Sequence, residues 1–191
     1  MPYPSRIDHS RIVETARELI EADGIDALTL RVVADRLGVK APSLYRYVKN
    51  KNAMLLAVNE VTLKELNVVI TQAIDSEGLL IERLVKVAEV YRQYAHANPV
   101  CYELAMRSQP ELKPSLDVQV QMVLPIQALF AQRTGEADSL AALRGAVAFL
   151  RGWVSLENSQ QLRRGGDLNA HFEQSFRAYL AGWQINTNSD F

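Results

Sequence analysis

The sequence predicts an all-helical protein of about nine helices, in which a three-helix helix-turn-helix head precedes a larger helical body. Three observations support this fold class. Apolar residues recur at intervals of three and four along most of the chain, which is the spacing of a buried helix face. No stretch alternates apolar and polar residues with the period of a half-buried strand. Short polar or glycine-containing breaks separate the periodic stretches, so short turns are expected to connect the helices.

The first two helices are defined by their end signals. An amphipathic helix is expected to begin near Asp8 or Ser10 and to end at Gly24. Thr29 is a suitable N-cap for a second helix of about two turns, because its side-chain oxygen can accept a hydrogen bond from a free amide of the first turn. Gly38 is expected to end this second helix.

A third short helix and a basic run follow. Pro42 stands where the first turn of a helix tolerates proline, so residues 43–47 are expected to form this helix. Two short helices joined by a glycine-containing turn are typical of a helix-turn-helix. The net charge of the chain is −1, but residues 36–51 contain five Lys or Arg and no Asp or Glu. A surface that faces phosphates needs a local basic patch of this kind rather than a basic protein.

Longer helices are predicted for the body. The periodic stretches are residues 51–74, 79–97, 99–106, 115–133, 136–161 and 168–185. Pro125 is expected to kink or locally unwind its helix, because proline removes an amide and clashes with the preceding turn. Asp167 is a suitable N-cap for the last helix. The last two helices carry more apolar residues than one chain needs for its core, which indicates a self-pairing surface.

Small residues are spaced along the stretch 136–161. Gly145 and Gly152 are seven residues apart, with Ala141 and Ala148 beside them. Small residues allow a second helix to approach closely. That helix could come from a partner subunit or from the same chain, and the sequence leaves both alternatives open.

Composition and motifs exclude several function classes. Cys101 is the single cysteine, so no intrachain disulfide can form, and a reducing compartment is expected. No run of 18 apolar residues or secretory signal is present, so we expect a cytoplasmic protein without a membrane partner. His96 and His171 lack metal-ligand spacing, and neither a metal nor a cofactor is predicted. Nucleophile-elbow, zinc-protease and phosphate-loop motifs are missing, which argues against an enzyme.

Residues 8–56 resemble the DNA-binding head of the TetR family of transcriptional regulators. The resemblance rests on ALTLRVVA at 27–34 for the second helix and on LGV at 37–39 for the turn. APSLYRYVKNK at 41–51 is similar to the recognition helix and the start of the fourth helix. RGWVSLE at 151–157 is similar to a WHG-type C-terminal subgroup, in which His-Gly usually stands where this chain has Arg-Gly.

The family resemblance implies a domain arrangement and a mode of action. Residues 1–50 would form the DNA-binding domain, and residues 51–191 the effector-binding and dimerisation domain. The protein would act as a homodimer, most often a repressor, that pairs through its last two helices on an inverted-repeat operator. A small-molecule effector would release it by favouring a different spacing of the two heads. The alternative is a helical protein-interaction module without specific DNA binding, which would not require the acid-free basic run.

The candidate DNA-binding residues have side chains suited to phosphates or base edges. Hydrogen-bond donors and a cation suited to phosphates are Thr29, Ser43, Tyr47 and Lys51. Arg31 is long enough to pair with guanine O6 and N7, and Lys40 could reach a base or a phosphate. Small apolar residues suited to a thymine methyl are Ala41 and Pro42, and residues able to contact either base or backbone are Tyr45 and Arg46.

Candidate effector-binding residues are distributed over the body helices. A regulatory pocket would be mostly apolar with a few polar anchors. Each candidate is also a residue type that commonly fills a core. The candidates are Tyr91, Tyr94, Tyr102, Met106, Met122, Phe149, Trp153 and Glu157.

Overall fold

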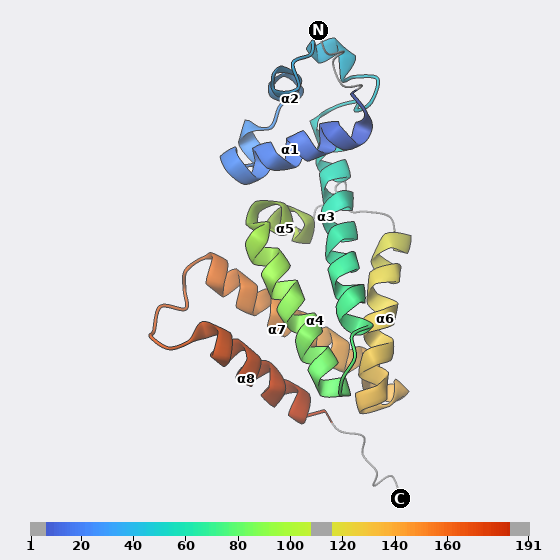
Figure 1. Cartoon of the computed structure of the whole chain (residues 1–191), viewed down its shortest axis with the longest axis vertical. Helices are drawn as coiled ribbons and strands as arrows, with labels where there is room; N and C mark the ends of the chain where they lie inside the picture. Colours follow the sequence, from blue (N-terminus) through green and yellow to red (C-terminus); the bar gives the residue numbers. More distant parts are fainter. Residues whose placement is uncertain (1–6, 108–115, 184–191) are drawn as a thin grey trace, which may run out of the picture. The chain divides into compact units, whose positions relative to one another are not determined.

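A computed structural model describes residues 7–107 and 116–183, and it divides the chain into two compact units. Unit 1 consists of Met1–Glu65 and Asn98–Ser115, and unit 2 consists of Leu66–Ala97 and Leu116–Phe191. The described residues form eight α-helices and two short 3-10 helices, without a strand (Figure 1). The all-helical prediction is therefore confirmed, and the helix count is close to nine. The two ends predicted at Ser115 and Ile185 lie outside the described residues.

Unit 1 is built from short helices whose starts agree with the sequence. Its elements are α1 (His9–Asp23), η1 (Ile25–Ala27), α2 (Leu30–Arg36), η2 (Ala41–Ser43), the first part of α3 (Lys51–Ile74) and α5 (Pro99–Met106). Asp8 caps α1 by accepting the Arg11 amide at 2.9 Å. Thr29 caps α2 by accepting the Val32 amide at 3.1 Å. The N-cap predicted at Thr29 is confirmed, and of the two starts expected for the first helix, Asp8 and Ser10, the cap lies at Asp8.

The core of unit 1 is apolar and continuous. Its fully buried members include Ile12, Ala16 and Ile20 of α1, Val33 of α2, Leu44 after η2, Met54 and Val58 of α3, and Cys101 of α5. Burial raises the pKa of the Cys101 thiol to about 12, and the neighbouring Glu21 carboxylate adds to this effect. The thiol therefore stays protonated and packs as an apolar group.

The third helix of the head differs from the sequence prediction. Residues 41–43 form the 3-10 helix η2, and residues 44–47 continue as turns instead of an α-helix. The amides of Ser43 and Leu44 donate to carbonyls three residues back, at 2.9 and 3.0 Å. Pro42 has no amide to donate, and a segment this short gains too few i to i−4 hydrogen bonds to form a regular α-helix.

Unit 2 is a helical layer in which α4 packs against three other helices. Its elements are the second part of α3, α4 (Leu80–Ala97), α6 (Leu116–Thr134), α7 (Glu136–Asn158) and α8 (Leu168–Ala181). Helix α4 contacts α6, α7 and α8, and α7 also packs on α6 and on α8 (Figure 1). Asp167 caps α8 by accepting the amides of Asn169 and Ala170 at 2.9 and 3.3 Å, as the sequence predicts.

A run of aromatic rings fills the contact between α7 and α8. The Phe149 ring of α7 lies 5.6 Å from Trp153 and 5.5 Å from Phe176, measured between ring centroids. Trp153 and Phe172 meet edge to face at 5.5 Å. Offset and edge-to-face pairs of this kind stabilise a core beyond the apolar area that they bury. They hold α8 on one face of α7.

Gly145 lies on the same face of α7 and receives a side chain of α8. The Tyr179 hydroxyl donates a hydrogen bond to the Ala142 carbonyl and passes over Gly145. A Cβ atom at position 145 would lie 2.5 Å from the Tyr179 hydroxyl oxygen and 3.1 Å from the ring. Gly152, in contrast, has no neighbouring atom within 4 Å of such a Cβ. Of the two alternatives that the sequence left open, packing within the chain applies to Gly145.

Helix α6 continues through Pro125 as a single element. Of the two effects predicted for Pro125, a kink or local unwinding, the unwinding is not seen. Pro125 is exposed, so water can reach the carbonyl that loses its partner, and the helix need not open to satisfy that group. Neither α6 nor any other described helix combines the length and the apolar character needed to cross a membrane.

Replacement of Gly145 by alanine is expected to destabilise the protein. The new methyl group would displace Tyr179 and weaken its hydrogen bond to Ala142. Overpacking of this kind costs about 1–3 kcal/mol, which outweighs the gain in helix propensity. Urea denaturation of Gly145→Ala should show a lower midpoint. The control Gly165→Ala, where no atom lies within 4 Å of the new methyl, should keep it, and equal midpoints for both variants would contradict the packing argument.

Candidate functional site

An exposed basic surface lies on α2 and on the segment that follows it in unit 1. The side chains of Arg31, Lys40 and Arg46 are exposed, and none of them forms an ion pair with the described residues. Tyr45 is also exposed, at 57% of its surface. A large aromatic side chain with so much free surface is unusual in a folded core region. This surface therefore presents cations and an aromatic ring to solvent.

The turn between α2 and η2 positions these side chains. The Val39 amide donates to the Ala34 carbonyl at 2.9 Å, and the Gly38 amide donates to Asp35 at 3.2 Å. This arrangement requires the positive φ of +69° at Gly38, which a glycine adopts without a steric cost. The chain can thus reverse within a few residues, and Lys40 is exposed directly after the turn.

The ten candidate DNA-binding residues divide into two groups by exposure. The exposed residues are Thr29, Arg31, Lys40, Pro42, Tyr45 and Arg46, and the half-buried residues are Ala41, Ser43, Tyr47 and Lys51. The guanidinium of Arg46 lies 4.8 Å from the centre of the Tyr47 ring, a cation-π contact that limits the freedom of the arginine. The Thr29 hydroxyl oxygen accepts the capping hydrogen bond from the Val32 amide, while the hydroxyl hydrogen stays available to donate.

Two of the candidate phosphate donors already donate hydrogen bonds to backbone carbonyls of unit 1. The Tyr47 hydroxyl donates to the Ile7 carbonyl at 2.8 Å, and the Lys51 ammonium donates to the Ile25 carbonyl at 2.9 Å. An ammonium has three N–H groups, so Lys51 keeps donors for another partner. Tyr47 has a single O–H, so a phosphate contact would require it to leave Ile7. The sequence pattern does not identify the Ile7 and Ile25 carbonyls as their acceptors.

The candidate effector-binding residues do not form one group. Tyr102 and Met106 lie on α5 in unit 1, and Tyr102 is buried in it. The remaining six lie in unit 2, where they are distributed over α4, α6 and α7: Tyr91, Tyr94, Met122, Phe149, Trp153 and Glu157. Phe149 and Trp153 belong to the aromatic contact with α8, and Tyr94 lines a groove of about 420 Å³ between α3 and α4.

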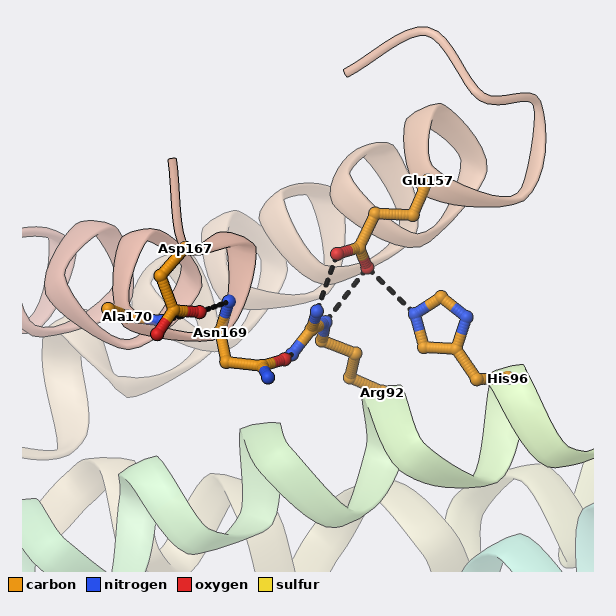
Figure 2. Close-up of polar contacts among 6 residues, drawn as sticks. All are labelled: Arg92, His96, Glu157, Asp167, Asn169 and Ala170. Atoms are coloured by element: carbon orange, nitrogen blue, oxygen red, sulfur yellow. Dashed lines mark hydrogen bonds and ion pairs between the residues drawn. The ribbon is translucent and has the colours of Figure 1, made fainter. Parts of the chain in front are cut away.

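Glu157 is the centre of a polar cluster in unit 2. Figure 2 shows Arg92 and His96 of α4 pointing toward its carboxylate, with Asn169 and Asp167 at the start of α8. The Arg92 guanidinium donates to both Glu157 oxygens, at 2.8 and 2.6 Å, and to the Asn169 side-chain oxygen at 2.9 Å. His96 Nε2 lies 2.8 Å from the carboxylate. The cluster joins α4, α7 and α8.

Burial and hydrogen bonding shift the pKa of Glu157 in opposite directions. The side chain is 5% exposed. Desolvation alone would raise the pKa of the carboxyl group, but hydrogen bonds from Arg92 and His96 and the guanidinium charge lower it below its ordinary value. The carboxylate is therefore charged at neutral pH and keeps Arg92 in place.

A cleft of about 620 Å³ lies beside this cluster, lined by α4 and by the first turn of α8. Arg92, His96 and Asn169 are among its lining residues, as are the acidic residues Glu89 and Glu173. The candidates from the sequence included Glu157 but missed Arg92 and Asn169. Arg92 and His96 are four residues apart and so share a face of α4. That spacing was the one available signal.

Comparisons with known proteins agree for both units. The model of the bacterial regulatory proteins of the tetR family matches residues 12–58, and the tetracyclin repressor-like C-terminal domain model matches residues 84–179, half of the chain. An uncharacterized HTH-type transcriptional regulator of Bacillus subtilis, YobS, is 25% identical over 93% of both chains.

Solved structures share the fold. A Rhodococcus protein of unknown function has a TM-score of 0.82 at 19% identity, covering 96% of this chain and 99% of that one. A TetR variant from Acinetobacter baumannii in complex with minocycline has a TM-score of 0.69 at 24% identity, covering 93% and 96%.

Replacement of Glu157 by glutamine should reduce stability in a pH-dependent way. A carboxyl group with a lowered folded pKa stabilises the protein above its ordinary pKa of 4.5, and this contribution is lost as the pH falls through the folded value. Glu157→Gln should therefore cost about 1–3 kcal/mol at pH 7, and this cost should shrink as the pH falls below 4.5 and through the folded pKa. Urea denaturation at several pH values measures this, with the exposed Glu103→Gln as control. A difference independent of pH would contradict the assignment.

Proposed function

From the premise that this chain belongs to the TetR family of DNA-binding transcriptional regulators, we propose that it is a homodimeric repressor released from its operator by a small molecule. The observation that carries this proposal is the exposed basic surface on α2 and the η2 segment. Its cations have no acidic partner among the described residues, and the phosphates of DNA supply one. The family contains regulators rather than enzymes. Its place of action would be the cytoplasm.

Base reading is assigned mainly to exposed side chains of α2 and the segment after it. Arg31, at the start of α2, would pair with guanine, while Lys40 and Arg46 would contact bases or phosphates. Tyr45 would pack against a base or a sugar, and Pro42, together with Ala41, would contact a thymine methyl. The remaining candidates, Thr29, Ser43, Tyr47 and Lys51, would bind phosphates and set the register.

Dimerisation is assigned to the outer faces of α7 and α8. The exposed residues of α7 include Ala141, Ala148 and Gly152, and those of α8 include Ala178 and Ala181. Apolar side chains flank the small residues, with Leu140 at 39%, Val147 at 41% and Leu156 at 39% exposure. A twofold pair of such faces would form a four-helix bundle. Two heads about 34 Å apart would then read an inverted repeat.

The effector is expected to bind in unit 2. The groove between α3 and α4 is lined by apolar side chains that include Val69 and Val90, with Tyr94 as a polar anchor. A solved structure of similar fold, the Acinetobacter TetR variant, was crystallised with minocycline. An effector would release DNA only if it binds the released state more tightly than the DNA-bound state. In this arrangement residues 1–50 serve DNA binding, and residues 51–191 serve the effector and the dimer.

The operator can be found by selecting bound duplexes from a random pool with the purified protein. We expect enrichment of an inverted repeat with half-sites one helical turn apart. Affinity for the enriched duplex should fall steeply with salt, with a log-log slope on the order of −5 if six phosphates are neutralised. A folded protein that enriches no sequence would contradict the proposed function.

Alanine substitution of Arg31 tests the base-reading assignment. Loss of a bidentate guanine contact should weaken binding to the selected operator about 10- to 100-fold and relax its sequence preference at one position of each half-site. Binding to random DNA should change little. Arg36→Ala is the matched control, because Arg36 lies on the same helix as Arg31 but is paired with Asp23 of α1 at 3.2 Å. Equal operator affinity for Arg31→Ala and the wild type would refute the assignment of Arg31.

A charged residue on the outer face of α8 tests the dimer. Ala178→Arg would place two like charges near the proposed twofold axis, so we expect the protein to become a monomer. Light scattering coupled to size exclusion should then give the 21.4 kDa mass of one chain instead of twice that value. Gln132→Arg, an exposed site on α6, is the control. A dimeric Ala178→Arg protein would show that the interface lies elsewhere.

A further inference from the structure

Unit 1 contains a buried arginine that the DNA-binding surface does not use. Arg17 lies on α1 with only 8% of its surface exposed, among the apolar residues of the head. A buried cation must be paired and hydrogen-bonded to persist in such surroundings. The partners of Arg17 therefore reveal which segments its position depends on.

The main partner of Arg17 is Glu65 on α3. Two parallel hydrogen bonds join the guanidinium to this carboxylate, at 2.7 and 2.8 Å. The same guanidinium also contacts Glu14 on its own helix at 3.2 Å and the Asn98 side-chain oxygen at 3.4 Å. A bidentate pair fixes the direction of both side chains, because two hydrogen bonds define a plane. Arg17 thus sets how α1 lies on α3.

A second side chain of α1 binds the start of α5. The Glu21 carboxylate accepts the amides of Val100 and Cys101, at 3.1 and 2.8 Å. These are amides of the first turn of α5, which a residue at the Asn98 position would ordinarily cap. Asn98 forms no such cap and turns its oxygen to Arg17 instead. Glu21 and Arg17, one turn apart on α1, together hold the beginning of α5.

Two of the residues that Arg17 contacts outside α1 are those at which the chain passes between the units. Glu65 is the last residue of unit 1 before the chain enters unit 2, and Asn98 is the first residue after it returns. The remaining passage, at Ser115, lies outside the described residues. If α3 or the junction between α4 and α5 rotates, the movement is transmitted to unit 1 at these two residues. Arg17 is in contact with both of them.

We propose that Arg17 is a positioning residue that holds α1 of the DNA-binding head on Glu65 and Asn98, the two positions at which the chain passes between the units. It thereby sets the spacing of half-sites that the dimer accepts. This inference rests on the proposed function. Arg17 itself contacts no DNA in this proposal. It determines the direction of α1, against which α2 packs, and so the direction in which the basic surface faces.

Arg17→Gln is the appropriate test variant. It removes the charge and the bidentate geometry without leaving an unpaired cation in the core. Its partner Glu65 has a side chain that is 45% exposed, so water can solvate the carboxylate that remains. Arg17→Lys is a second variant, which keeps the charge but not the paired hydrogen bonds. Arg36→Gln is the matched control in the same unit, because Arg36 pairs with Asp23 at a solvent-exposed site.

The decisive readout is affinity for operators in which the half-sites are moved apart or together by 1 and 2 base pairs. Moving one half-site by 2 base pairs rotates it by roughly 70° around the DNA axis. Wild type and Arg36→Gln should lose at least tenfold in affinity on this shift. Arg17→Gln and Arg17→Lys should lose less than threefold, because their heads can reorient. Thermal unfolding confirms that each variant is folded.

A structural role without positioning would give a different result. In that case the Arg17 variants would bind all operators more weakly by a common factor and keep the wild-type dependence on spacing. That outcome, or unchanged binding, would overturn the inference.

If the wild type enriches no inverted repeat, the proposed function fails first, and amide hydrogen exchange then decides the role of Arg17 alone. Faster exchange at Val100 and around Glu65, with unchanged protection at Ile12 and Leu44, would support positioning. Unchanged exchange at Val100 and Glu65 would overturn it.

Discussion

The segments that carry the exposed basic residues are too short to be stable alone. Helix α2 has seven residues and η2 has three, whereas isolated helices shorter than about 12 residues are marginal in water. They persist because their inward side chains are part of a continuous core with α1, α3 and α5. Leu44 is fully buried while its neighbour Tyr45 is 57% exposed. The direction of each exposed side chain is therefore fixed by the packing of an apolar neighbour one or two residues away, and the surface can be no more rigid than that core.

Two ion pairs, each with one buried member, join helices that are far apart in the sequence. Arg17 is a buried cation paired with a carboxylate 48 residues away, and Glu157 is a buried anion paired with a guanidinium 65 residues away. Such pairs contribute little net stability compared with an apolar contact of the same size, because desolvation offsets the attraction. An arrangement that separates the partners leaves a charge unpaired in the core and is strongly disfavoured. Their effect is thus to exclude alternative packings of helices that apolar contacts alone would tolerate.

The features predicted well from the sequence are those determined by local chemistry. Asp8 and Thr29 cap their helices because a side-chain oxygen next to the first free amides needs no distant partner. The third helix of the head was predicted as an α-helix because Pro42 is tolerated in a first turn, but that rule does not count the few i to i−4 hydrogen bonds that so short a segment can form. The candidate effector-binding residues were chosen by type, and nothing local indicated that Tyr102 packs in unit 1. Arg17 was indistinguishable from a solvated arginine, because its partner comes from a different helix.

The two glycines of α7 have different surroundings. A contact within the chain accounts for the small size of Gly145 but not for that of Gly152. Position 145 has no room for a side chain because Tyr179 of α8 passes over it, so a contact within the chain explains this glycine. Gly152 faces open space, and around it Val147 and Leu156 remain 41% and 39% exposed. An apolar face with small residues is poorly suited to water, and a helix that already buries one face in its own core has no use for a second. Every copy of the chain presents this same face, so a twofold partner can cover it without any additional component. In the proposed dimer, the apolar surplus on the last two helices would be buried between the two copies.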